Sequence, residues 1–218
     1  MRLDPALVAR RLALALALPL LAPAPGHGQA LYDAFVRAVE TDDSVQVRAM
    51  LGRGVDPNVV DAHGEPVLVV AARAGWEKTV DVLLSAGAKV DAANSFGDRP
   101  IMVAALNGHL AIVKTLLAHG AALNAPGWTP LAYAASTGQI HVVGYLLDAG
   151  AAIDAPSPNG TTALMMAVRG GYRETVGLLL DRGANVNLRN QQEATALGWA
   201  KRGGFDDIEV ALRQHGAK

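Results

Sequence analysis

The residues of this chain whose side chains could do chemistry are its histidines and its adjacent carboxylates. Six histidines are scattered through the sequence, and no two of them have the spacing of a zinc-binding helix. The paired carboxylates Asp42-Asp43 and Asp206-Asp207 stand near expected helix starts, where the helix dipole favours negative charge. The sequence has no glycine-rich phosphate loop and no nucleophile elbow. We therefore expect no catalytic residue, no metal site and no cofactor, and the chain is predicted not to be an enzyme.

Composition argues against further classes of function. Without cysteine, the chain cannot form a disulfide, a thiol nucleophile or a thiolate zinc site. The formal net charge is −1, and it becomes −3 without residues 1–30, which hold three arginines and one aspartate. A mildly acidic surface argues against nucleic acid as a partner, because binding to phosphates needs clustered positive charge.

Two short clusters could be a modification site and an anion-binding site, but each is better explained by local structure. The stretch 159–161, Asn-Gly-Thr, matches the N-glycosylation pattern and is more typical of a tight turn before a helix. Arg169, Arg173 and Arg182 could bind an anion, but acidic side chains interleave with them. We interpret these arginines as a solvated helix face.

The elements that must position these residues come from a repeat. A Gly-Ala pair, or a close relative, recurs at spacings of 33, 33, 30, 33 and 33 residues, with its glycines at Gly54, Gly87, Gly120, Gly150, Gly183 and Gly216. A fixed period of this length is typical of stacked structural units.

Each unit is predicted to contain two helices. Upstream of each glycine lies an apolar trio at i, i+3 and i+4, such as Val80, Leu83 and Leu84, which share one helix face. The glycine suits the left-handed residue that closes a helix. A shorter helix precedes this one and carries an alanine pair, such as Ala71-Ala72, that lets neighbouring helices approach closely.

This pattern resembles that of a known repeat family. The stretch 127–135, Gly-Trp-Thr-Pro-Leu-Ala-Tyr-Ala-Ala, with the residues that follow it, resembles the ankyrin repeat: Gly138, Val142-Val143, Leu146-Leu147 and Gly150-Ala151. The resemblance covers residues 31–218 and implies an all-α solenoid of helix-turn-helix units joined by hairpin loops. The family's usual motif histidine, which bonds between units, is replaced by Val69, Met102, Ala132, Met165 and Gly198. Apolar packing must substitute for that bond here.

The period divides the chain into six expected units: an N-terminal capping unit at 31–59, repeats at 60–92, 93–122, 123–155 and 156–188, and a C-terminal capping unit at 189–218. The 30-residue spacing indicates a shortened hairpin loop between Leu123 and Gly127. In the last unit, Glu209 and Arg213 occupy apolar positions of the trio, which predicts that this helix faces water.

Local signals predict how several helices begin. Thr129 is placed to cap the helix that starts at Pro130. Asp98 could take the same role before the next proline upstream, and Asp33 could cap the first helix. Asp42 stands where the later units carry glycine.

Residues 1–30 have the three-part layout of a secretory signal peptide. Arg2, Arg10 and Arg11 precede an apolar run at 12–21, and small residues lead to a cleavage site that we expect after Ala30. The run is too short to span a bilayer, so no membrane span is expected after cleavage. The alternatives are a retained membrane-proximal anchor and a disordered tail.

The resemblance also implies where a partner would bind, because the family binds proteins on the concave face of its loops and first helices. Mapped onto this chain, the exposed positions of that face are His63, Glu65, Arg73, Phe96, Asp98, Asn107, Trp128, Thr137, Asn159, Thr161, Arg169, Gln191, Gln192 and Arg202. Phe96 and Trp128 flank the short loop and are expected to be its binding anchors. The alternative is that each ring folds over its own hairpin. Tyr133 and Trp199 are expected to pack between helices.

The function that follows is a non-enzymatic scaffold that binds a protein partner of unknown identity. The signal peptide predicts action in the periplasm, and the chain resembles small exported ankyrin proteins of Gram-negative bacteria. A monomer is favoured. The alternative is a secreted effector or a toxin-neutralising, immunity-type protein, whereas an enzyme would need a pocket with converging polar groups.

Overall fold

The computed structural model describes residues 25–218 and divides the chain into two units, residues 1–33 and Ala34–Lys218. Of the first unit, only 25–33 are described, as the first part of helix α1 (Pro25–Glu40). Most of the predicted signal peptide lies outside the described residues. Among residues 25–218, no helix combines the length and apolar character that crossing a membrane requires.

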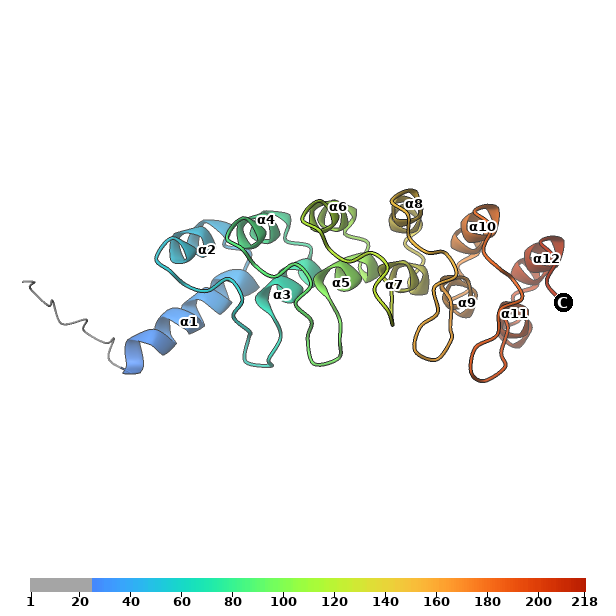
Figure 1. Cartoon of the computed structure of the whole chain (residues 1–218), viewed down its shortest axis with the longest axis horizontal. Coiled ribbons are helices and arrows are strands. Elements are labelled where there is room, and N and C mark those ends of the chain that lie inside the picture. Colours follow the sequence, from blue (N-terminus) through green and yellow to red (C-terminus); the bar gives the residue numbers. More distant parts are fainter. Residues whose placement is uncertain (1–24) are drawn as a thin grey trace, which may run out of the picture. The chain divides into compact units, whose positions relative to one another are not determined.

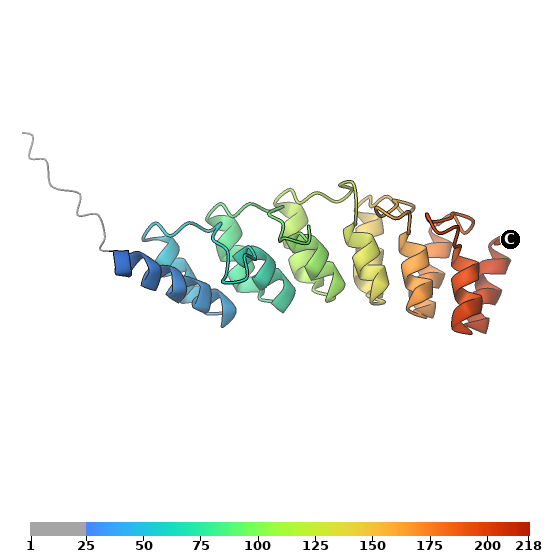
Figure 2. The same cartoon turned by 90° about the horizontal axis from the view of Figure 1, so that it is seen from below.

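The unit Ala34–Lys218 consists of paired helices in two layers (Figure 1). The layer of first helices contains α3 (Val67–Ala74), α5 (Pro100–Leu106), α7 (Pro130–Ser136), α9 (Ala163–Arg169) and α11 (Ala196–Gly203). The layer of second helices contains α2 (Ser44–Leu51), α4 (Glu77–Ser85), α6 (Leu110–Ala118), α8 (Ile140–Asp148), α10 (Arg173–Asp181) and α12 (Asp206–Gln214). From α3 to α12, the two helices of each unit pack on each other, and equivalent helices of successive units pack side by side. Figure 2 shows the pairs side by side. The predicted all-α solenoid is confirmed, and within 25–218 the extended contact is one isolated bridge between Val60 and Pro66.

The core is thin and built from small and branched apolar side chains. The alanine pairs of the first helices, such as Ala104 and Ala105, are fully buried, which lets α5 lie close to α3 and α7. Val80 and Leu83 of the trio are also fully buried. Four of the residues that replace the motif histidine are buried too: Val69, Met102, Ala132 and Met165. Apolar packing therefore fills those positions, as expected.

The turn between the two helices of a unit needs a residue with left-handed backbone conformation (positive φ). The same residue lies close to a side chain of the next unit. Gly75 has φ +87°, and a Cβ built there would lie 2.6 Å from the ring of His109 in the next unit. Asp42 holds the same position in the first unit with φ +55°, and its carboxylate accepts a hydrogen bond from the Thr79 hydroxyl (2.7 Å). Asp42 thus tolerates the conformation while joining two units.

Of the three predicted helix caps, one is confirmed. Thr129 caps α7 as predicted, with its hydroxyl accepting from the Ala132 N–H at 3.2 Å, and Thr162 and Thr195 cap α9 and α11 in the same way. The other two predicted caps are wrong. Arg99, not Asp98, stands at the start of α5 and makes no side-chain cap bond. Asp33 lies inside α1 because that helix begins earlier than expected.

The segments that connect a second helix to the next first helix, here called fingers, project on the side of the first helices (Figure 1). They comprise residues 52–66, 86–99, 119–129, 149–162 and 182–195. The finger at 119–129 has 11 residues, whereas each of the last two has 14, so the predicted shortening is confirmed.

A ladder of side-chain acceptors at the bases of the fingers joins successive units. Asn58 accepts from the Lys89 N–H (2.8 Å), and Asp91 accepts from the Ala122 N–H (3.1 Å). The same bond recurs from Ala152 to Asn124, from Asn185 to Asp154 and from Lys218 to Asn187. This ladder, which sequence analysis missed, supplies polar bonds between units that lack the motif histidine.

The predicted exposure of the charged residues on the last helix is confirmed for Arg213. Arg213 is exposed, and its guanidinium pairs with Glu209 across one turn of α12 (2.8 Å). The two charged residues therefore satisfy each other on the solvent-exposed side of α12.

Candidate functional site

The fingers and the adjoining sides of α3, α5, α7, α9 and α11 form one surface, here called the finger face. Three hollows lie on it in chain order. Eight of the predicted site residues and two aromatic residues expected to be core line these hollows.

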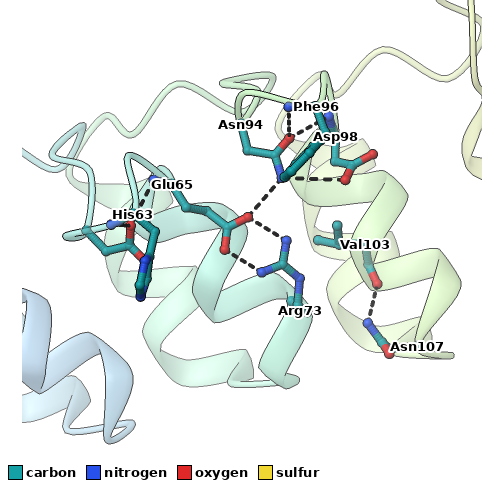
Figure 3. Close-up of polar contacts among 9 residues, drawn as sticks. His63, Glu65, Arg73, Asn94, Phe96, Asp98, Val103 and Asn107 are labelled. Atoms are coloured by element: carbon teal, nitrogen blue, oxygen red, sulfur yellow. Dashed lines mark hydrogen bonds and ion pairs between the residues drawn. The ribbon is translucent and has the colours of Figure 1, made fainter.

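The first hollow, of about 380 Å³, gathers five predicted residues: His63, Glu65, Arg73, Phe96 and Asp98. The Arg73 guanidinium reaches from the end of α3 to both carboxylate oxygens of Glu65 on the finger (Figure 3). The amide of Asn94, on the next finger, donates to the same carboxylate at 2.9 Å. The hydrogen bond from Arg73 lowers the pKa of Glu65, and the same bond raises the pKa of Arg73. This pair is internally neutralised, and the bond from Asn94 ties two units together.

Phe96 is displayed rather than packed. Its side chain is 88% exposed, and its backbone N–H donates to the side-chain oxygen of Asn94 (3.0 Å), which fixes the finger beneath the ring. The predicted exposure of Phe96 is confirmed. Covering a large exposed aromatic ring with another protein surface removes apolar area from water, which favours binding.

The second hollow, of about 160 Å³, is mainly apolar and lies beside the short finger. Trp128 and Tyr133 meet edge to face across it, with ring centroids 6.1 Å apart, and Leu106 and Met166 complete its walls. Trp128 is half-buried, so its ring folds against Tyr133 instead of standing free like Phe96.

Tyr133 is a functional candidate that sequence analysis placed in the core. It is half-buried and lines the second hollow, and its hydroxyl donates a hydrogen bond to Asp98, one unit away. Burial, followed by the bond to Asp98, raises the pKa of Tyr133. Its register was the available signal, because the equivalent residue of the next unit, Met166, lies 33 positions later on the same helix side and also lines the second hollow.

The third hollow, of about 410 Å³, lies at the far end of the finger face. Arg169 and Arg202 line it with Trp199 and Phe205, and both arginines are exposed. Trp199 was expected to pack between helices, but it is half-buried and takes part in this surface.

The remaining predicted residues are not brought into the hollows. Asn107 donates to the Val103 carbonyl (2.9 Å), and Thr137 donates to the Leu106 carbonyl (2.6 Å), so both secure helix ends. Gln191 donates from its backbone to the Asn159 carbonyl (2.9 Å), which joins two neighbouring finger tips. Gln192 is exposed at the same tip.

Thr161 corrects the sequence-based map. It was placed among the exposed positions, but it is only 2% exposed. Its N–H donates to the Ser157 hydroxyl (3.0 Å), which folds the finger over it. The equivalent positions carry the longer Glu65 and Asp98, whose carboxylates reach out of the finger base, whereas a threonine hydroxyl is too short to do so.

The finger face offers recognition chemistry. It presents an aromatic ring, an apolar slot and guanidinium groups from rigid helices and tied loops. Within residues 25–218, no three or more histidine, aspartate or glutamate side chains are grouped to hold a metal ion. His109, for example, has its Nε2 at 3.1 Å from the Arg73 carbonyl.

Comparison with known proteins decides the family. The family model described as ankyrin repeats (3 copies) matches residues 35–126 and 122–190. The chain belongs to the ankyrin repeat family. Ankyrin repeats generally mediate protein–protein interaction, and ankyrin repeat proteins are generally scaffolds without enzymatic activity.

Two similar ankyrin proteins place the array among known structures and sequences. The crystal structure of an ankyrin repeat domain from Acinetobacter baumannii is similar with a TM-score of 0.76 and 33% identity, over 86% of this chain and all of that one. The Ankyrin repeat and KH domain-containing protein mask from Drosophila melanogaster is 38% identical over 96 residues, which is 41% of this chain. That match spans only 2% of the fly protein.

Proposed function

We propose that this ankyrin array is a non-enzymatic scaffold that acts in the periplasm and holds a protein partner on its finger face. The observation that carries the proposal is that Phe96, 88% exposed, lines the first hollow on the finger whose Asp98 bonds Tyr133 of the second hollow. Aromatic anchors beside an apolar slot are typical of the residues that dominate binding energy at protein interfaces.

The proposed compartment rests on the N-terminal sequence. Positive charges, an apolar run of about ten residues and a small-residue cleavage site precede the array, as in exported proteins. The proposed mature protein begins at Leu31 and is a monomer. The second candidate, a secreted effector or toxin-neutralising protein, has the same N-terminal signal and would use the same finger face.

Binding is tested with Phe96→Ala/Trp128→Ala against a matched control. Val45 on α2 is 78% exposed in the layer of second helices, so Val45→Ala removes an equally accessible apolar group away from the finger face. Proteins that the native chain captures from a periplasmic extract should be lost with the double variant and kept with Val45→Ala. Circular dichroism verifies that both variants are folded. If the double variant captures every partner of the native chain, the finger face is not the binding surface.

The compartment is tested by fractionation and by the mass of the processed chain. A periplasmic protein whose mass corresponds to residues 31–218 supports the proposal. Recovery from the growth medium, with a toxin or foreign protein bound, favours the secreted alternative. Recovery of the unprocessed chain from the cytoplasm contradicts both.

A further inference from the structure

The third hollow carries a charge arrangement that differs from the rest of the finger face. Three units carry an arginine at the same repeat position, in the last turn of the first helix on the finger face. These residues are Arg73 on α3, Arg169 on α9 and Arg202 on α11. In the first of these units the finger supplies the carboxylate of Glu65, which pairs with Arg73.

The other two arginines have lost that partner. The finger positions equivalent to Glu65 hold Thr161, which is buried, and Ala194, which has no polar side chain. Among the described residues, no side-chain hydrogen bond or ion pair is made by the guanidinium of Arg169 or by that of Arg202.

Two carboxylates of the last unit pair with other arginines. Glu193, on the last finger, lies 3.7 Å from Arg189, and Asp207, on α12, pairs with Arg173 at 3.3 Å. Neither arginine of the hollow forms an ion pair with these or any other described carboxylate.

The geometry of the hollow favours a carboxylate with an apolar neighbour. The helices α9 and α11 pack on each other, and packed helices lie roughly 8–10 Å apart, so two arginine side chains can converge on one group between them. Trp199 lies one turn before Arg202 on the same side of α11 and supplies an aromatic wall. Guanidinium groups bind carboxylates through paired hydrogen bonds, as Arg73 does with Glu65.

We propose that the third hollow binds an acidic residue of the protein partner, with its carboxylate held by Arg169 and Arg202 and an adjacent apolar side chain against Trp199. This inference rests on the proposed function and specifies the partner chemistry at one end of the finger face. An acidic protein segment fits better than nucleic acid. In this hollow a polyanion would meet only two arginines, on a chain of net charge −1, and affinity for DNA grows with the number of phosphates neutralised.

The test is a selection of random dodecapeptides displayed on phage, performed on the full chain. The native chain should enrich Asp and Glu at one position, next to an apolar residue. Arg169→Glu/Arg202→Glu should instead enrich Lys and Arg there. The matched control is Arg48→Glu/Lys78→Glu, which reverses two exposed charges on α2 and α4, and it should select the same acidic peptides as the native chain.

A selected peptide then measures the contact directly. Arg169→Ala and Arg202→Ala should each weaken its binding by about fivefold, the upper range for an exposed ion pair. Replacing the acidic peptide residue by its amide should weaken binding by a similar factor. The two changes should not multiply, because each removes the same contact.

The outcomes separate this inference from the proposed function. If peptides are selected without an acidic preference and are lost with Phe96→Ala/Trp128→Ala, the finger face binds proteins but the inference is wrong. An acidic preference that survives Arg169→Glu/Arg202→Glu also overturns it, as does tight binding of a DNA duplex at physiological salt that this variant abolishes. If no peptide is enriched and no partner is captured, both are wrong.

Discussion

Asn124 is the most direct probe of how the units are joined, because its side chain makes two bonds across the centre of the array. Its Oδ1 accepts from the Ala152 N–H (2.8 Å), and its Nδ2 donates to the Gly150 carbonyl (3.0 Å). Each hydrogen bond contributes about 1 kcal/mol net, and water can reach this exposed site. We expect Asn124→Ala to lower the free energy of unfolding by about 1–2 kcal/mol.

Asn187 provides a matched control at the end of the array. It makes the same two bonds, from the Lys218 N–H and to the Gly216 carbonyl, both at 3.1 Å. A terminal unit has one neighbour and frays independently, so Asn187→Ala should affect global unfolding less. Asn124→Ala should also reduce the urea m-value, because weaker coupling at the centre lets the two halves unfold separately.

The assay is urea unfolding followed by far-ultraviolet circular dichroism and by tryptophan fluorescence. Trp76 reports on the N-terminal half, and Trp128 and Trp199 report on the other half. Single-tryptophan versions distinguish the halves. The reasoning is refuted if Asn124→Ala destabilises the protein no more than Asn187→Ala, or if both halves of Asn124→Ala unfold at one midpoint with the native m-value.

Three further predictions test the turns, an ion pair and the terminal cap. Gly87→Ala should cost about 1–2 kcal/mol for its positive φ alone, whereas Gly75→Ala should lower the melting temperature further because the ring packed against it must also move; equal losses would contradict this. Since Arg73 lowers the folded pKa of Glu65, the pair stabilises the protein above the unfolded pKa, near 4.5, and this contribution is lost as pH falls. Glu65→Gln should therefore be less stable than the native chain in neutral urea titrations and approach it near pH 3; a constant difference would refute the assignment. Arg213→Leu should increase self-association at high concentration, measured by size exclusion with light scattering, because it adds an apolar side chain to the exposed side of α12; a mass equal to that of the native protein would contradict this.

The fold could be predicted from sequence because its determinants are local. The apolar trios, the alanine pairs and the cap at Thr129 each act within one helix or its immediate neighbour, and the period repeats them. The two wrong helix-cap predictions were also made from local sequence alone. Asp98 is engaged by the hydroxyl of Tyr133, which lies 35 residues away in sequence, and no local pattern indicates that bond.

The candidate site was less predictable because it depends on how far each side chain reaches. The register correctly brought Glu65, Arg73 and Phe96 to one hollow, since the repeat fixes where their backbones lie. It misplaced Thr161, whose short side chain is covered by its own finger. It also placed Tyr133 in the core. The equivalent residue of the preceding unit, Val103, is buried, whereas Tyr133 lines the open slot beside the short finger.

The finger face is directional because a regular scaffold carries an irregular set of side chains. From the first hollow to the third, a neutralised ion pair gives way to an apolar slot and then to two unpaired arginines. The helices beneath keep these features at fixed spacings, so a partner cannot adjust one contact without shifting the others. A partner that uses all three hollows must therefore present its apolar and acidic groups in one order, and reversing its chain direction would place a carboxylate beside Asp98 instead of Arg169 and Arg202.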